Sequence, residues 1–341
     1  MEQQKKRNRL ISLAVCLLML ATLMAPLNVQ VASAASTLQD PRIEADGTIT
    51  WDCVYFGHYP QRANGKGGFD NEPIKWRVLS INGDDAFLLS DKNLDVKAYN
   101  EEDDYVSDIT WETCTLRSWL NGYSSTENEN GLDYSSDNFK DTAFNQTEQN
   151  AILEKTIKNE DNPVYETDGG NDTKDKVFLL SIDEIRDEQL GFPEDPDFDI
   201  VRGTINTEYA SSKEEELGEE TFNWWWLRSP GQAQDVASCV RDDGYLVYWY
   251  GLYNSDYGTY SVRPAIYLDL SSNVWVNAGT VSCKGNVEES VEPPIPSKPT
   301  TPTAKASQTI TAKSFTKTYG NKPFSLGAKA KTKLSYKSSD T

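Results

Sequence analysis

Few side chains in this sequence have the types and spacing that catalysis requires. His58 is the only histidine in the chain. Ser-His-Asp, Cys-His and multi-histidine metal chemistry would therefore all depend on this one residue. It lies in the run YFGHYPQ, which predicts a strand entering a proline turn and an exposed turn histidine. The sequence therefore favours a protein that is not an enzyme.

The cysteines favour disulfide chemistry over metal binding. Beyond Cys16, the chain carries a widely spaced set of four: Cys53, Cys114, Cys239 and Cys283. An even number of cysteines favours disulfides in an exported protein, and zinc sites use ligands only a few residues apart. We expect a bridge between Cys53 and Cys283, which would join the two ends of the domain. Free buried thiols are the alternative.

Acidic residues dominate the charge of the chain. It has 53 Asp and Glu against 33 Lys and Arg, a formal net charge of −20. This excess disfavours nucleic acid as a partner. Paired carboxylates for glycoside hydrolysis are conceivable, but no pair stands out among so many acids.

One acidic run has the alternating spacing of calcium ligands. An EF-hand loop would also need glycine at its sixth position and glutamate at its twelfth, where the chain has Ile200 and Asn206. A calcium site of another kind remains a hypothesis, and solvated loop acids are the alternative. The candidate ligands are Asp195, Asp197 and Asp199, or Asp168, Asn171 and Asp172. We expect no other cofactor.

The aromatic residues offer the chemistry of recognition. Indole and phenol rings stack on sugar faces while Asn and Asp bind hydroxyls, and the same residue types also suit protein partners. In the run NWWWLRSPG, strand alternation would place Trp224 and Trp226 on one face and Trp225 and Leu227 on the other. The predicted recognition residues lie further on: Tyr248, Trp249, Tyr250, Tyr253, Asn254, Asp256 and Tyr257.

Strands and short helices must position these residues. Strand-like runs cover residues 49–90, with a hairpin turn at Asn82-Gly83, and four more lie between residues 224 and 268. Between them the pattern predicts a helix in 110–123 ending at Gly122, and a second in 144–157. A third runs from Ser181 to Gly191, and residues 193–221 read as a long loop. The fold class is therefore α+β.

The two ends of the chain differ from this middle part. A basic start and a short apolar run predict a signal peptide over residues 1–34, with a retained membrane anchor as the alternative. The domain then covers 35–285, and a Pro- and Thr-rich linker follows over 286–307. Residues 308–341 have too few strands for a stable core. We expect a secreted or cell-surface protein that does not insert into the membrane after signal cleavage.

Seven runs together resemble a family of extracellular bacterial domains, domain of unknown function 6273, common in exported proteins of Gram-positive bacteria. They are YFGHYPQ (55–61), PIKWRVL (73–79), LLSDKNLD (88–95), TWETCTLRSWLN (110–121), VFLLS (177–181), NWWWLRSPG (223–231) and SVRPAIYL (261–268). The resemblance spans roughly residues 45–283.

The resemblance implies a C-type-lectin-like fold, with helices flanking small twisted antiparallel sheets and paired chain ends. It places Trp225 and Leu227 in a central core strand, with Arg228 and Arg263 binding loop carbonyls or carboxylates. Trp76 and Trp119 are assigned to the core as well. The tail from Gln308 resembles an incomplete bacterial immunoglobulin-like domain. Its missing continuation could carry a cell-wall anchor.

Related folds include a formylglycine-generating oxidase that binds copper through cysteines. Cys239 and Cys283 are the only conceivable counterparts, and neither lies in that family's motif. We therefore expect a non-enzymatic module that binds extracellular glycans or proteins through residues 245–260. Adhesion without sugar binding is the alternative, and a remote oxidase or glycosidase is a further one.

Overall fold

The structure is a computed structural model that describes residues 38–101, 108–194, 199–216, 223–253 and 259–283. For residues 249–253 it describes the backbone alone. The predicted signal peptide, linker and immunoglobulin-like tail lie outside these residues, and so does most of the acidic run at 195–199.

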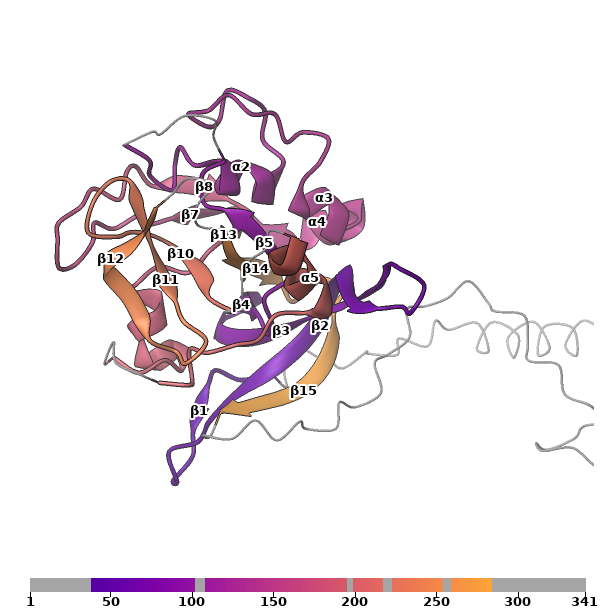
Figure 1. The fold of residues 1–341 in the computed structure, drawn as a ribbon. Helices are drawn as coiled ribbons and strands as arrows, with labels where there is room; N and C mark the ends of the chain where they lie inside the picture. The colour runs from indigo at the N-terminus through magenta and orange to yellow at the C-terminus, as the bar shows by residue number, and fades with distance from the viewer. Residues whose placement is uncertain (1–37, 102–107, 195–198, 217–222, 254–258, 284–341) are drawn as a thin grey trace, which may run out of the picture. The chain divides into compact units, whose positions relative to one another are not determined.

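An eight-stranded sheet forms one side of the core (Figure 1). Its path runs β1-β2-β3-β4-β14-β6, while β15 also pairs with β2 and β9 with β14. All its pairs are antiparallel. The turn between β3 and β4 contains Gly83 at φ 64°, as the Asn-Gly pair predicts. The strands are β1 (Arg42–Ile43), β2 (Ile49–Ala63), β3 (Phe69–Asn82), β4 (Asp85–Ser90), β6 (Ile152–Leu153), β9 (Val177–Phe178), β14 (Ala265–Asp269) and β15 (Val276–Cys283).

A five-stranded sheet carries the aromatic region. Its order is β12-β11-β10-β13-β5, and β10 and β13 run parallel whereas the other pairs are antiparallel. The strands are β5 (Asp95–Ala98), β10 (Trp225–Pro230), β11 (Val236–Val240), β12 (Leu246–Tyr253) and β13 (Thr259–Val262). A separate two-stranded sheet pairs β7 (Lys155–Ile157) with β8 (Thr173–Asp175).

Short helices lie in the three predicted stretches, and the structure adds α3, which the sequence analysis did not predict. In α2, the Cys114 thiol accepts a hydrogen bond from the Arg117 amide, and Gly122 ends the helix at φ 70°. In α4, Asn145 and Glu148 form the predicted capping box, but the helix ends at Ala151 because the chain then enters β6. The third predicted helix is two 3₁₀ turns ended by Gly191. The bounds are α2 (Thr115–Asn121), α3 (Phe139–Ala143), α4 (Gln146–Ala151), η2 (Glu184–Arg186) and η3 (Glu188–Leu190).

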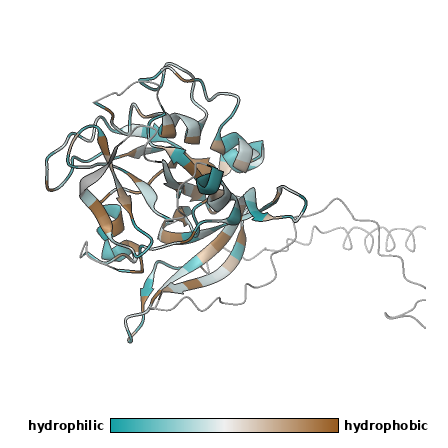
Figure 2. Cartoon of the chain, viewed as in Figure 1, coloured by the Kyte–Doolittle hydropathy of each residue, from teal (hydrophilic) through white to brown (hydrophobic). Residues whose placement is uncertain are grey.

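The predicted long loop at 193–221 contains a helix, α5 (Glu208–Glu216), so that prediction was wrong. Its residues are mostly hydrophilic, which hid the helical period in the sequence (Figure 2). Tyr209 fixes α5 to the eight-stranded sheet through edge-on contacts with Tyr59 of β2 and Phe69 of β3, at ring-centroid distances of 5.8 and 5.1 Å.

The prediction of an exposed turn at His58 is also wrong. β2 continues through this residue to Ala63, and His58 is half-buried opposite Pro73 of β3. The register between β2 and β3 shifts twice, between Tyr55 and His58 and again near Pro60. These irregularities let the strand accommodate a proline without ending.

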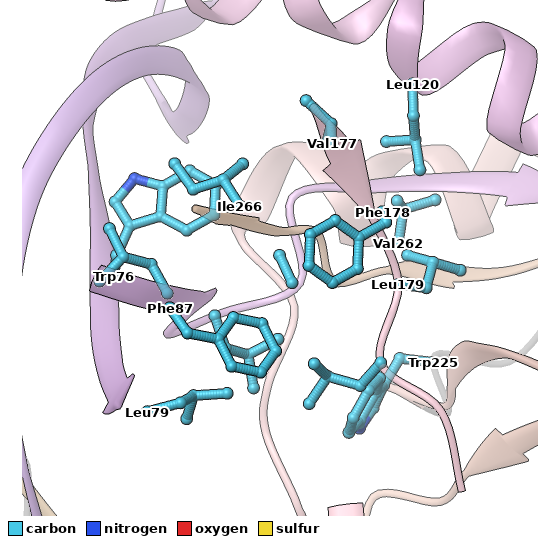
Figure 3. Packing of buried hydrophobic residues seen from close by; sticks show 14 of the residues in the cluster. Trp76, Leu79, Phe87, Leu120, Val177, Phe178, Leu179, Trp225, Val262 and Ile266 are labelled. Carbon is cyan, nitrogen blue, oxygen red and sulfur yellow. The ribbon is translucent and has the colours of Figure 1, made fainter. Parts of the chain in front are cut away.

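Both sheets contribute to one hydrophobic core. It includes Trp76 and Phe178 of the large sheet and Trp225 of the small one, and Figure 3 draws all three. The described part of the chain is mostly β with a few short helices, which agrees with the predicted α+β class. No helix among the described residues combines the length and the hydropathy needed to cross a bilayer.

Candidate binding surface on the five-stranded sheet

One row of side chains crosses the five-stranded sheet at the start of β10. Trp225 is opposite Val240 on one side and Ser261 on the other, and Val240 is opposite Leu246. The residues next to these positions therefore line up across four strands. We call them the aromatic row: Tyr245, Arg241, Trp224 and Tyr260. All four are half-buried.

The members of the aromatic row stack on one another. The rings of Trp224 and Tyr260 lie 5.7 Å apart at 15°. The guanidinium carbon of Arg241 lies 5.3 Å from the Trp224 ring centroid and 5.7 Å from that of Tyr245. Both neighbours of Trp224 in the row thus pack on its ring.

A tight turn holds one end of the row. Asp243 accepts hydrogen bonds from the Arg241 side chain at 3.0 Å and from the Tyr245 amide at 3.1 Å. Gly244 follows at φ 79°, and a Cβ there would lie 1.7 Å from the Asp199 carbonyl oxygen. Only glycine allows the chain at Asp199 to approach so closely.

Two exposed isoleucines belong to the segment that this turn contacts. Ile200 is 43% exposed and Ile205 is 51% exposed. The next residue, Asn206, donates its amide to the Asn223 side chain at 2.8 Å, immediately before Trp224. Exposed apolar residues near a half-exposed aromatic row are typical of a binding surface.

The other two tryptophans are core residues. Trp225 is 0% exposed and packs under Arg263, whose guanidinium carbon lies 4.9 Å from its ring. Trp226 is also 0% exposed and donates its indole N–H to the Lys97 carbonyl at 2.9 Å. Of three consecutive tryptophans, only Trp224 therefore reaches the surface.

The structure buries every residue that the sequence assigned to the core. Arg228 donates to the carbonyls of Lys158 and Leu179 and forms an ion pair with Glu184. Arg263 donates to the carbonyls of Ser90, Arg202 and Asp91. Backbone acceptors thus hold both arginines in the interior. The buried set is Trp76, Trp119, Trp225, Leu227, Arg228 and Arg263.

Comparison with known proteins now places the chain in a family. A family model described as Domain of unknown function (DUF6273) matches residues 83–270. The chain belongs to this family. The matched range is narrower than the residues 45–283 that the motifs indicated, and it contains the aromatic row and the core residues Trp225 and Trp226. No curated protein and no solved structure matches the chain.

In this DUF6273 domain, the predicted recognition residues fall mostly on β12. Tyr248 is half-buried. Trp249, Tyr250 and Tyr253 continue the same strand, whose end pairs with β11 through Tyr253 and Val236. The structure does not describe the side chains of Trp249, Tyr250 and Tyr253. Asn254, Asp256 and Tyr257 lie outside the described residues.

A loop that the sequence analysis missed lies beside β12. Asn162 is 1% exposed and donates to the carbonyls of Pro230 and Tyr248 at 2.9 and 3.3 Å. Its side-chain oxygen accepts the amides of Val164 and Tyr165, which are 54% and 44% exposed. The Asn-Pro pair at 162–163 was the available signal, because this dipeptide marks turns.

The proposed calcium ligands do not form a cluster in the described residues. Asp199 caps its own turn by accepting the Val201 amide at 2.9 Å, while Asp195 and Asp197 are not described. In the alternative set, Asp172 forms an ion pair with Lys158, and an ammonium group there competes with a metal ion. The described residues contain no group of three or more His, Cys, Asp or Glu arranged to hold a metal.

The expected bridge between Cys53 and Cys283 is not formed. None of the four described cysteines forms a disulfide. In the β2–β15 pair, Cys283 is opposite Ile49. Ile49 is four residues from Cys53 along β2. That separation is roughly 13 Å, about twice the Cα distance that a disulfide spans. β2 and β15 do pair, but in a register that separates these sulfurs.

The thiols are also poor nucleophiles and ligands. Burial raises the pKa of Cys53 and of Cys114 to about 12. Burial also raises the pKa of Cys239 far above its usual range. A thiolate is the reactive and metal-binding form, so these three residues favour packing over chemistry.

Proposed function

We propose that this chain is an exported or cell-surface binding module that recognises glycan or protein ligands through one aromatic surface. The surface combines the aromatic row with the predicted region 245–260. The observation that carries the proposal is the stack of Trp224, Arg241 and Tyr260, which places three large, half-buried side chains next to one another where β10, β11 and β13 meet. Tyr and Trp side chains bind at a low cost in conformational entropy, and packing on Trp224 restricts the Arg241 side chain before a ligand binds.

A C-type-lectin-like fold is part of this proposal. Support comes from the pairing of β2, near the start of the domain, with β15 at its end, and from the short helices beside small antiparallel sheets. Long loops projecting from such a scaffold can vary in sequence while the paired ends keep the frame.

The test is a glycan array probed with the purified chain, with and without calcium, followed by titration of the hits by tryptophan fluorescence. Trp249→Ala and Tyr253→Ala should abolish sugar retention, whereas Ile43→Ala should not, although Ile43 is an exposed apolar residue of β1. Calcium-dependent hits would point to the acidic loops as the metal site. A carboxylate variant that lost turnover but kept binding would instead indicate an enzyme.

Protein adhesion is the second candidate, and one observation favours it. Both row neighbours of Trp224 already pack on its ring, so a sugar could not stack there without displacing Arg241 or Tyr260. Trp, Tyr and Arg tips beside Ile200 and Ile205 have the composition of protein-interface hot spots. A folded chain that binds no glycan but loses a protein partner in Arg241→Ala would support this candidate.

A further inference from the structure

Asp95 is a buried carboxyl group at a contact between the two large sheets. It begins β5 of the five-stranded sheet and is 4% exposed. The hydroxyl of Tyr59, on β2 of the eight-stranded sheet, donates a hydrogen bond to Asp95 Oδ2, and the Val96 amide donates to Oδ1 at 2.8 Å. Each carboxyl oxygen thus has one donor, and the Tyr59–Asp95 hydrogen bond joins the two sheets.

Asp95 has no ion pair among the described residues, which distinguishes it from Asp175. That carboxyl group is 0% exposed and pairs with Arg117 at 2.8 Å. A buried carboxylate without a cation is costly, and the neutral carboxylic acid avoids this cost. Burial accordingly raises the pKa of Asp95 above its ordinary value, although the hydrogen bond from Tyr59 opposes this change.

Helix α5 packs beside the Asp95–Tyr59 pair. It contacts β2, β5 and β13 (Figure 1), and its Tyr209 ring meets the Tyr59 ring edge-on at a centroid distance of 5.8 Å. Few buried residues hold the helix, because only Ala210 and Glu214 of its nine residues are buried. A helix of this length is unstable on its own, so we expect α5 to open before the rest of the domain.

Two ammonium groups act on Asp95, and both have partners elsewhere. Lys97, two residues along β5, has its Nζ 5.0 Å from the Trp119 ring centroid. Lys213 of α5 forms an ion pair with Glu216 at 2.9 Å. Both charges lower the pKa of Asp95, but by less than burial raises it. The other titratable or charged groups on the elements packed here are His58, Tyr59 and Arg62 of β2, Glu208, Tyr209, Glu214 and Glu215 of α5, Tyr260 of β13, and Asp137.

The two tyrosines at this contact stay neutral around neutral pH. Burial, and then the charge of Asp95, raise the pKa of Tyr59 far above its usual range. Burial raises the pKa of Tyr209 to about 12. A change of charge within the Asp95–Tyr59–Tyr209 contact near neutral pH is therefore a change at Asp95.

We propose that α5 is a pH-sensitive clasp: it is held against both sheets while Asp95 is protonated, and it opens more readily once Asp95 is ionised. Opening of α5 lets water reach the carboxylate, so the ionised form favours the open state. A carboxyl whose pKa is higher in the closed state stabilises that state below its open-state pKa, near 4, and this contribution is lost as the pH rises through the closed-state value. The clasp is independent of the function proposed for the aromatic row.

Hydrogen exchange of the full chain, followed by mass spectrometry, tests the clasp. The opening constant of the α5 amides, corrected for the intrinsic exchange rate at each pH, should rise at least about fivefold from about pH 5 to about pH 8, because each unit of pKa difference allows about tenfold. The β3 amides are the internal reference, since their exchange requires the domain to unfold. A flat profile for α5, or the same rise in α5 and β3, would overturn the proposal.

Variants connect the effect to Asp95. Asp95→Asn should give a flat α5 profile at the protection that the parent shows near pH 5, because an amide keeps hydrogen-bonding groups but carries no charge. His58→Gln is the matched control: it removes the residue before Tyr59, whose type titrates near neutral pH, and the rise should persist. Loss of the rise in His58→Gln would assign the effect to the histidine and refute the role of Asp95.

Should Asp95→Asn fail to fold, Tyr59→Phe decides. This change keeps the ring that Tyr209 contacts and removes the hydroxyl whose hydrogen bond favours ionised Asp95. The pKa of Asp95 should then rise further, so α5 opening should level off at a higher pH than in the parent protein. Opening that levels off at the same pH in both proteins would contradict the proposal.

Discussion

Trp224 and Tyr260 stack nearly parallel, with ring centroids 5.7 Å apart, although 36 positions separate them in the sequence. The parallel pairing of β10 with β13 brings them together, through a hydrogen bond of 2.8 Å from the Ser261 amide to the Trp224 carbonyl. Arg241 packs on the other side of Trp224 and turns the pair into a row. The surface of the small sheet is therefore built by strand register.

Replacing Arg241 by methionine should impair ligand binding without unfolding the domain. The side chain is 34% exposed and its ion pair with Asp243 is equally open to solvent, so stability should change by no more than about 1 kcal/mol. Urea unfolding measures the stability, and fluorescence titration with an identified ligand measures the binding. Unfolding of Arg241→Met at room temperature would show that the row is structural.

Trp225→Ala should destabilise the domain by about 3–5 kcal/mol, because it opens a cavity in the shared core. Trp224→Ala is the matched control and should cost clearly less, because its ring is half-exposed. Chemical denaturation of both variants tests the difference. Equal losses in the two variants, or a loss in Trp225→Ala well below about 3 kcal/mol, would contradict the core assignment.

The described thiols should react only slowly in the native state. Cys53, Cys114 and Cys239 are buried with raised pKa values, whereas Cys283 is half-buried. Mass spectrometry after brief alkylation should find label on Cys283 before the other three, and on all four after unfolding. A disulfide-linked pair of peptides containing Cys53 and Cys283 in a non-reducing digest would contradict this prediction and show that the bridge forms.

Local signals in the sequence predicted local features of the structure. Gly122 ends α2, Asn145 and Glu148 cap α4, and Gly83 forms the hairpin turn, because each of these depends on a few neighbouring residues. The aromatic row could not be predicted, since it depends on the register of four strands that meet only in the folded chain. The same limit explains the disulfide: β2 and β15 pair, but the offset between these two strands, which separates Cys53 from Cys283, is set only in the folded chain.

Helix α5 was missed for a different reason. Its residues are nearly all polar, and its attachment depends on Tyr209 fitting between Tyr59 and Phe69. Tertiary contacts of this kind override a weak helical period. The recognition residues on β12 remain a prediction, because the side chains beyond Tyr248 lie outside the description.

Acid should weaken the domain partly through Asp91. Although burial opposes its ionisation, the charges of Arg77 and Lys75 lower the net pKa of Asp91 below its ordinary value. A carboxyl whose pKa is lower in the folded state stabilises the fold above the unfolded pKa, near 4, and this contribution disappears as the pH falls through the folded value.

Asp91→Asn should therefore be less stable than the parent protein at pH 7, and the difference should shrink below about pH 4. Thermal unfolding from neutral to acidic pH measures this difference. Asp243→Asn is the matched control, since it removes a carboxylate that pairs with arginine at the surface. A constant gap between parent and Asp91→Asn across the acid range would show that Asp91 acts through its shape and hydrogen bonds and not through its charge.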